Sequence, residues 1–202
     1  MSFEYGFSER MVMSNGVVAT TNIEEILTEH LPGITQVVRA SADEDRSGTD
    51  WWACTTARRL SIDAKVREQD WSLKNRDDLA LEIYSVESEY DRDGAWLPIP
   101  EERRKVGWTR DANKTTDYVL WLWKDTGRFC LVPFPMLCRI YDDLWASWFF
   151  DYGSSRQRTP FKKGQRGFND DAVGYHSECS VIPRRMVWSE IYKRYSPNIA
   201  PD

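Results

Sequence analysis

The chain has 202 residues, of which 41% are hydrophobic and 13% aromatic, and this composition excludes a wholly disordered protein. Its length suits one domain with a sizeable core. The formal net charge of −5 argues against a protein that coats nucleic acid through its overall charge. A local basic patch beside an acidic centre remains compatible with that charge.

Neither an export signal nor a membrane span is visible in the sequence. The first residues, MSFEYGFSERMVMSNG, lack the basic and apolar regions of a secretory signal. No segment reaches the ~18 uninterrupted apolar residues that a membrane helix needs. Two histidines, and four cysteines without CxxC spacing, argue against a zinc site. We therefore expect a cytoplasmic protein with no membrane partner.

Hydrophobic periodicity predicts a helix followed by strands in the first half of the chain. The segment 20–33, TTNIEEILTEHLPG, has apolar residues at helical spacing and ends at a Pro-Gly pair. The segment 42–48 is expected to be a polar turn, and 87–108 a polar surface excursion. Strands are expected at 34–41, 49–55, 59–67 and 77–86.

The second half predicts a hairpin, a helix, a long loop, and then a closing strand and helix. The hairpin joins 117–123 to 129–134 through a turn that contains Gly127. These elements predict a single α/β layered domain over 1–202, with a mixed central β-sheet flanked by helices. Its expected parts are a core at about 20–150, a basic loop at 151–174, and the closing strand and helix at 175–202.

One strand, RLSIDAKVR at 59–67, carries charge on one face only. Alternation puts Asp63, Lys65 and Arg67 on one side, opposite an apolar side made of Ile62, Ala64 and Val66. A hairpin with the preceding strand would bring Asp50 alongside. Two carboxylates that face a common point suit Mg²⁺ or Mn²⁺, and a nearby Lys can stabilise charge on a phosphate. The alternative interpretation is an ordinary solvated strand face, because an acid two residues before a Lys often occurs by chance.

These residues resemble the PD-(D/E)XK nuclease superfamily, also called restriction-endonuclease-like, of the small phage and bacterial type. The matching segments are GTD ending at Asp50 and IDAK at 62–65, preceded by the helix NIEEIL. The strand, hairpin and helix that follow extend the resemblance to about 20–150. Thr49 stands where many members have Pro. The resemblance implies a restriction-endonuclease-like fold and a Mg²⁺-dependent phosphodiesterase, for which DNA is favoured over RNA as the substrate.

The resemblance also implies roles for individual residues. Asp50 and Asp63 would ligate Mg²⁺ or Mn²⁺ with help from the Ala64 carbonyl, and Lys65 would position or activate the attacking water. A Glu on the predicted helix would match the accessory acid of the family: Glu24 in preference to Glu25, because Glu24 borders the apolar stripe.

The roles of two further residues, Glu82 and Arg67, are less closely defined by the resemblance. Glu82 would add an acid to the catalytic site or, equally well, pair with a cation on the sheet face. Arg67 would meet a phosphate of the substrate, although family members often have an uncharged polar residue there.

A second group of cations lies in the expected basic loop, RQRTPFKKGQRGF. Basic residues in a Gly-rich loop can hold a phosphate backbone, and interleaved aromatic residues can stack on bases. A solvated basic loop is the alternative. The residues predicted to bind nucleic acid here are Arg156, Arg158, Lys162, Lys163 and Arg166.

A different class of function stays open from the sequence. The chain could be a catalytically silent nuclease-fold binding protein, such as a phage inhibitor or adaptor of a host machine. The presence of Asp50, Asp63 and Lys65 together favours the enzyme, because a decayed site usually loses one of them. Dimers are common in the superfamily, so a homodimer also stays open.

Overall fold

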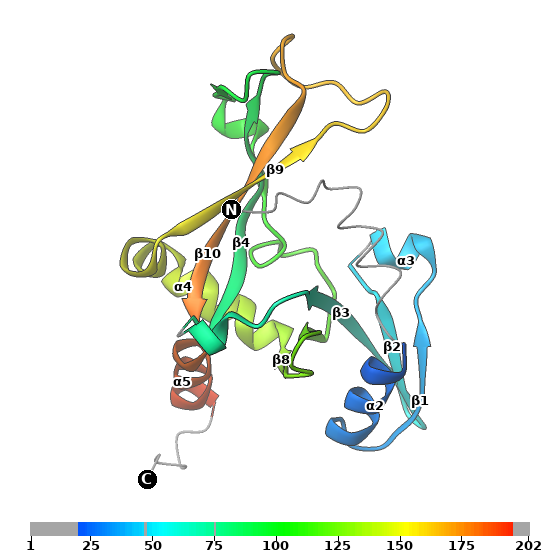
Figure 1. Ribbon diagram of the computed structural model, residues 1–202. Coiled ribbons are helices and arrows are strands. Elements are labelled where there is room, and N and C mark those ends of the chain that lie inside the picture. Colours follow the sequence, from blue (N-terminus) through cyan, green and yellow to red (C-terminus); the bar gives the residue numbers. More distant parts are fainter. Residues whose placement is uncertain (1–19, 47, 75, 196–202) are drawn as a thin grey trace. The chain divides into compact units, whose positions relative to one another are not determined.

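The computed structural model describes residues 20–46, 48–74 and 76–195, and these form two compact units (Figure 1). The first unit contains the described residues up to Asp70 together with Asn113–Met136. The second contains Trp71–Ala112 and the described residues from Leu137 onward. Organisation as a single domain over 1–202 stays a prediction.

The first unit is built on a five-stranded mixed sheet with the order β1-β2-β3-β7-β8. β3 and β7 run parallel, whereas the other neighbours are antiparallel. The mixed sheet and the α/β class therefore agree with the sequence prediction. The strands are β1 Ile34–Arg39, β2 Trp51–Thr55, β3 Arg59–Arg67, β7 Tyr118–Trp123 and β8 Phe129–Pro133.

Helix α2, Thr20–His30, covers one face of this sheet (Figure 1). Its Ile23 and Leu27 are fully buried and share a core with Ile62 of β3. Ala64 and Val66 pack against the same core. Because side chains alternate along a strand, this packing turns Asp63 and Lys65 toward the opposite face, as the sequence predicts.

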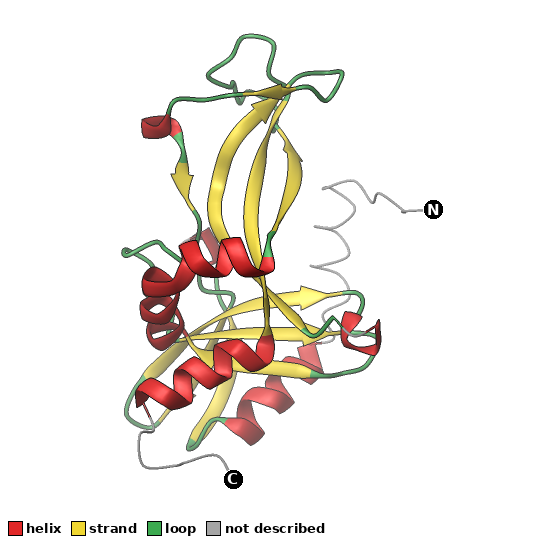
Figure 2. Ribbon diagram, turned by 90° about the vertical axis from the view of Figure 1, so that its left-hand side faces the viewer, coloured by secondary structure: helices red, strands yellow, loops and turns green. Residues whose placement is uncertain are grey.

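The second unit has its own sheet, with the order β5-β4-β10-β9 and β6 paired to β4. All of its pairings are antiparallel, and its long strands end in loops (Figure 2). The expectation of one central sheet is therefore wrong, because the described residues form two. The strands are β4 Asp78–Tyr90, β5 Trp96–Leu97, β6 Lys105–Val106, β9 Ser154–Pro160 and β10 Gly174–Pro183.

Two longer helices follow the sequence prediction closely. α4 spans Phe134–Tyr152, and α5 spans Arg184–Tyr195. Short 3-10 helices cover Trp71–Lys74 and Glu101–Arg103. Among the described residues, no helix is long and apolar enough to cross a membrane.

The structure corrects three expected loops. The polar excursion at 87–108 contains the end of β4, the short strands β5 and β6, and a 3-10 helix. The polar turn at 42–48 contains a short helix, α3 Ala42–Arg46. It begins with a capping box, in which the Ser41 N–H and hydroxyl both donate to the Glu44 carboxylate at 2.7 Å. The basic segment 151–174 is only partly a loop, because β9 pairs with β10. β9 is an exposed edge strand, so it lacks the apolar alternation by which a half-buried strand is recognised.

Candidate functional site

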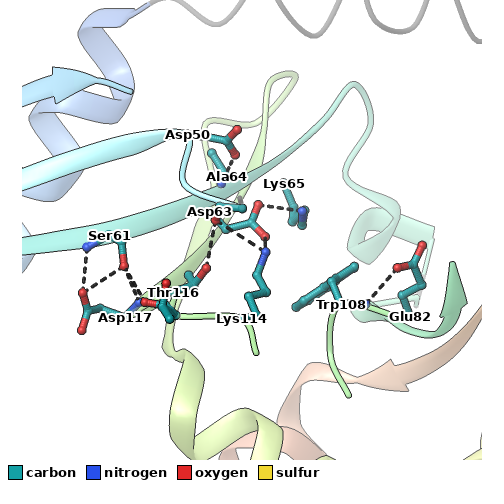
Figure 3. A network of polar contacts seen from close by, with 12 residues as sticks. Asp50, Ser61, Asp63, Ala64, Lys65, Glu82, Trp108, Lys114, Thr116 and Asp117 are labelled. Carbon is teal, nitrogen blue, oxygen red and sulfur yellow. Dashed lines mark hydrogen bonds and ion pairs between the residues drawn. The ribbon is translucent and has the colours of Figure 1, made fainter. Parts of the chain in front are cut away.

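The hairpin of β2 and β3 brings Asp50 beside Asp63. Asp50 directly precedes β2, and its N–H donates to the Ile62 carbonyl at 2.9 Å. Its Oδ2 accepts the Ala64 N–H at 2.6 Å (Figure 3). Asp50 is thus hydrogen-bonded to the backbone of the residues before and after Asp63, which fixes the two acids side by side.

Two lysines share the carboxylate of Asp63 (Figure 3). Lys65 Nζ lies 2.6 Å from Oδ1, and Lys114 Nζ lies 2.7 Å from Oδ2. The side chain of Asp63 is 4% exposed and that of Lys114 is 8% exposed, whereas Lys65 is 24% exposed. Lys65 is therefore the cation of this pair that solvent, or a ligand, can reach more readily.

A clamp of hydrogen bonds holds the segment that carries Lys114. Asp117 accepts the Ser61 N–H at 2.8 Å and the Ser61 hydroxyl at 3.0 Å. The Thr116 hydroxyl donates to the Gly48 carbonyl at 2.9 Å. These hydrogen bonds join the segment before β7 both to β3 and to the loop that leads to Asp50, so the three parts of the site are fixed together.

Gly48 is required by the geometry of this loop. Its φ of +92° lies in the left-handed region that side chains disfavour. A Cβ built at this position would lie 2.4 Å from Lys114 Nζ. A side chain at position 48 would therefore both strain the backbone and push Lys114 away from Asp63.

The pKa values of the two carboxyl groups are shifted in opposite directions. Burial and the charge of Asp63 raise the pKa of Asp50 to about 7, although the Ala64 N–H and Lys65 oppose this shift. Burial would also raise the pKa of Asp63, but Lys65 and Lys114 outweigh it and lower that pKa. Near neutral pH, Asp63 is therefore ionised while Asp50 is poised to gain or lose a proton.

The donor set suits a hard divalent cation. Asp50 and Asp63 supply carboxylate oxygens, and the negative charge of Asp63 helps to raise the pKa of Asp50, as expected for two acids that share a site. No group of three or more His, Cys, Asp or Glu able to hold a metal occurs among the described residues. Mg²⁺ commonly keeps several waters and uses only one or two protein carboxylates together with substrate phosphate, so two acids would be enough for that ion.

The other residues expected in the catalytic site are placed differently. Glu24 is exposed on α2, and no described contact joins it to either aspartate. Arg67 is exposed at the end of β3. Glu82 belongs to the second unit, where its Oε2 accepts the Trp108 N–H at 3.0 Å (Figure 3). The structure therefore gathers Asp50, Asp63 and Lys65, and the catalytic roles of the other three stay predictions.

The residues predicted to bind nucleic acid divide between β9 and the loop after it. Arg156 and Arg158 lie on β9, and each already has a partner in the second unit. Arg156 Nε is 3.3 Å from Glu178 Oε1, and Arg158 Nη2 donates to the Gly94 carbonyl at 3.0 Å. The remaining cations are exposed in the loop 161–173 and are Lys162, Lys163 and Arg166.

Lys114 is the site residue that the sequence patterns do not reveal. It lies in NKTTD, before β7, in a segment without periodicity. Its position follows from the parallel pairing of β7 with β3, in which Tyr118 is opposite Ile62. That pairing joins strands that are distant in the chain, and local patterns do not show it. A Lys close to the start of an apolar strand is the only signal that the sequence offers.

Comparisons of the chain with protein-family models, curated proteins and solved structures found no match. The resemblance to the PD-(D/E)XK superfamily therefore rests on the residues of this chain alone.

Proposed function

We propose that the chain is a metal-dependent nuclease of the PD-(D/E)XK type that hydrolyses phosphodiester bonds, with DNA the favoured substrate. The observation that carries the proposal is the arrangement at β2 and β3. Asp50 is bonded to both backbone neighbours of Asp63, and Lys65 contacts the same carboxylate from the more exposed side. An acid pair with an adjacent cation is the chemistry that phosphodiester hydrolysis needs.

Each residue of the site has a part in the proposed reaction. Asp50 and Asp63 would hold Mg²⁺ or Mn²⁺, which when bound would supply Lewis acidity toward the phosphate. Lys65 can hydrogen-bond an attacking water or a phosphate oxygen and stabilise negative charge that develops there. Lys65 and Lys114 together keep Asp63 ionised, and the ion pair with Lys114 is largely buried.

One observation favours the alternative function, a binding protein without catalysis. Both oxygens of Asp63 already have a lysine partner, so the charge of this acid is balanced without a cation from solution. A fold without catalytic activity could retain such a network for stability. In the enzyme, a metal ion would bind the remaining lone pairs of these oxygens, against the repulsion of the two ammonium groups.

A cleavage assay distinguishes the two functions. Purified protein, free of chelator, is incubated with single- and double-stranded DNA and RNA in Mg²⁺, in Mn²⁺ or in EDTA. The nuclease is expected to cut at least one DNA substrate with a divalent ion and none in EDTA. If no substrate is cut with either ion, the binding function replaces the enzyme.

A further inference from the structure

A pair of arginines in the second unit surrounds an aromatic ring. Arg104 and Arg110 lie on either side of β6 in sequence, and β6 pairs with β4 at Tyr84. The guanidinium carbon of Arg104 is 5.6 Å from the centre of the Tyr84 ring, and that of Arg110 is 5.8 Å from it. Two cations therefore share one ring, and β6, which lies between them in sequence, pairs with β4.

Arg110 is also held by a second aromatic residue. Its guanidinium carbon lies 4.2 Å from the ring centre of Trp145, on α4. A guanidinium placed over an aromatic ring uses the face of its plane for this contact, so the N–H groups at its edge stay available for hydrogen bonds. The orientation of both arginines is thus set by aromatic neighbours rather than by acids.

Three nitrogens of these two arginines have no protein acceptor among the described residues. Arg104 Nε, Arg110 Nε and Arg110 Nη1 are buried and have no hydrogen-bond partner among the described residues, and the buried Thr109 hydroxyl beside Arg110 also has none. Within the same residues, no acidic side chain forms an ion pair with either arginine. Buried donors are nearly always satisfied in folded proteins, so these four polar atoms in one segment point to ordered water or a ligand as their partner.

We propose that Arg104 and Arg110 form a phosphate-binding site that holds the backbone of a nucleic acid. A guanidinium presents N–H groups in a planar fork that matches phosphate oxygens, and both arginine residues keep partial exposure through which a phosphate can approach. The choice of nucleic acid, rather than another anion, rests on the proposed nuclease function. This site differs from the basic residues of β9 and the loop 161–173, because its cations are partly buried and pre-oriented.

The test measures binding of fluorescein-labelled single- and double-stranded DNA by anisotropy, in EDTA so that nothing is cut. The variant is R104Q/R110Q, and the control is R92Q/R139Q, which removes the same charge from two exposed positions. The site predicts an affinity about tenfold or more lower for R104Q/R110Q, with the log–log salt slope reduced by ~0.7–0.9 for each phosphate that is no longer neutralised. The control is expected to bind like the parent.

A conservative variant separates binding from a structural role. R104K/R110K retains both charges but not the planar fork, so it should keep the salt slope of the parent while binding more weakly. If R104Q/R110Q fails to fold, as judged by thermal unfolding, the R104Q single variant and R104K/R110K decide the matter in the same assay.

Failure of this inference can be told apart from failure of the nuclease proposal. Parent-like affinity and salt slope in R104Q/R110Q, or a parent that binds neither DNA, would overturn the phosphate site whatever the cleavage assay shows. A parent that binds DNA through these arginines but never cuts it would support the site and contradict the nuclease.

Discussion

At the level of single residues, Lys65 and Lys114 contact one carboxylate from different environments. Lys114 is almost completely buried and is tied to the loop at Gly48, whereas Lys65 retains a quarter of its exposure. A buried cation beside a buried anion mainly supports the folded state, and an accessible cation can act on a substrate. The two lysines should therefore separate stability from catalysis.

Alanine substitution at each lysine tests this separation. Lys65→Ala should lower the free energy of unfolding less than Lys114→Ala does, because water can reach position 65 and Asp63 keeps its buried partner Lys114. Its cleavage rate should fall about 10²–10⁴-fold. Lys114→Ala should cost about 1.5–3 kcal/mol, as expected when a hydrogen bond between charged groups is removed. Urea unfolding in EDTA and single-turnover cleavage measure the two effects, and a Lys65→Ala protein that cuts at the parental rate would remove Lys65 from the mechanism.

Asp50 gives stability a characteristic dependence on pH. Its pKa is about 7 in the folded chain and near 4 when unfolded, so between these values the folded chain holds a proton that the unfolded chain lacks. Its contribution to stability is fully present below pH 4 and is lost as the pH rises through 7. The lowered pKa of Asp63 acts in the opposite direction and only at lower pH, where its contribution is lost as that acid becomes protonated.

The Asp50→Asn variant should remove this dependence. Its side-chain oxygen can still accept the Ala64 N–H, but no charge forms. In EDTA, the unfolding free energy of the parent should fall, relative to that of the variant, by up to about 1.4 kcal/mol for each pH unit as the pH rises from 4 to 7. Urea unfolding at several pH values measures this difference. If the unfolding free energies of the two proteins change with pH in parallel, the pKa of Asp50 is not raised by folding.

At the level of elements, the sequence predicts the parts whose patterns are local. α2, the β2–β3 hairpin, the β7–β8 hairpin, α4 and α5 all have a periodicity or a turn that can be read directly. The alternation of Asp63 and Lys65 against Ile62 predicts the polar face of β3 for the same reason. α3 escapes prediction although Ser41 and Glu44 stand at the spacing of a capping box, because a polar five-residue helix has no apolar stripe.

The features that the sequence patterns do not reveal depend on distant partners. β9 forms because β10 offers it an edge, with Arg156 opposite Glu178, and its own residues are almost all exposed. The position of Lys114 depends on the parallel pairing of β7 with β3. Two sheets in place of one likewise result from pairings between strands far apart in the chain, so no window of local sequence contains them.

The correction at β9 changes what is expected of the basic residues. Lys162, Lys163 and Arg166 are exposed in the loop 161–173, whereas Arg156 already pairs with Glu178. If the loop holds a phosphate backbone, changing its three cations to Ala should lower the log–log salt slope of DNA binding by ~0.7–0.9 for each phosphate that these cations neutralise. Anisotropy titrations at several salt concentrations measure the slope. The matched control changes three exposed arginines elsewhere, Arg92, Arg139 and Arg185.

An unchanged slope in the loop variant would assign these cations to the solvated surface. Arg156→Ala alone should instead lower stability, because it leaves the largely buried Glu178 without its cation.

At the level of the whole molecule, the two units differ in the chemistry that they carry. The first unit contains the acid pair and both lysines, and the second contains the arginine pair and the basic strand and loop. We therefore propose that the first unit hydrolyses the substrate. The second unit would provide most of the binding to the phosphate backbone. Variants in one unit should change cleavage rate with little effect on affinity, and variants in the other should do the reverse.

The proposed function depends above all on whether Asp50 and Asp63 hold the ion with which the chain cuts DNA. The cleavage rate is therefore measured as a function of Mn²⁺ concentration, for the parent, Asp50→Asn and the control Glu29→Gln, which removes an exposed acid from α2. We expect a rate that saturates with Mn²⁺ for the parent and the control, and no cleavage by a folded Asp50→Asn. Cleavage by Asp50→Asn at the parental rate, or none by the parent at any Mn²⁺ concentration, would contradict this role for the acid pair.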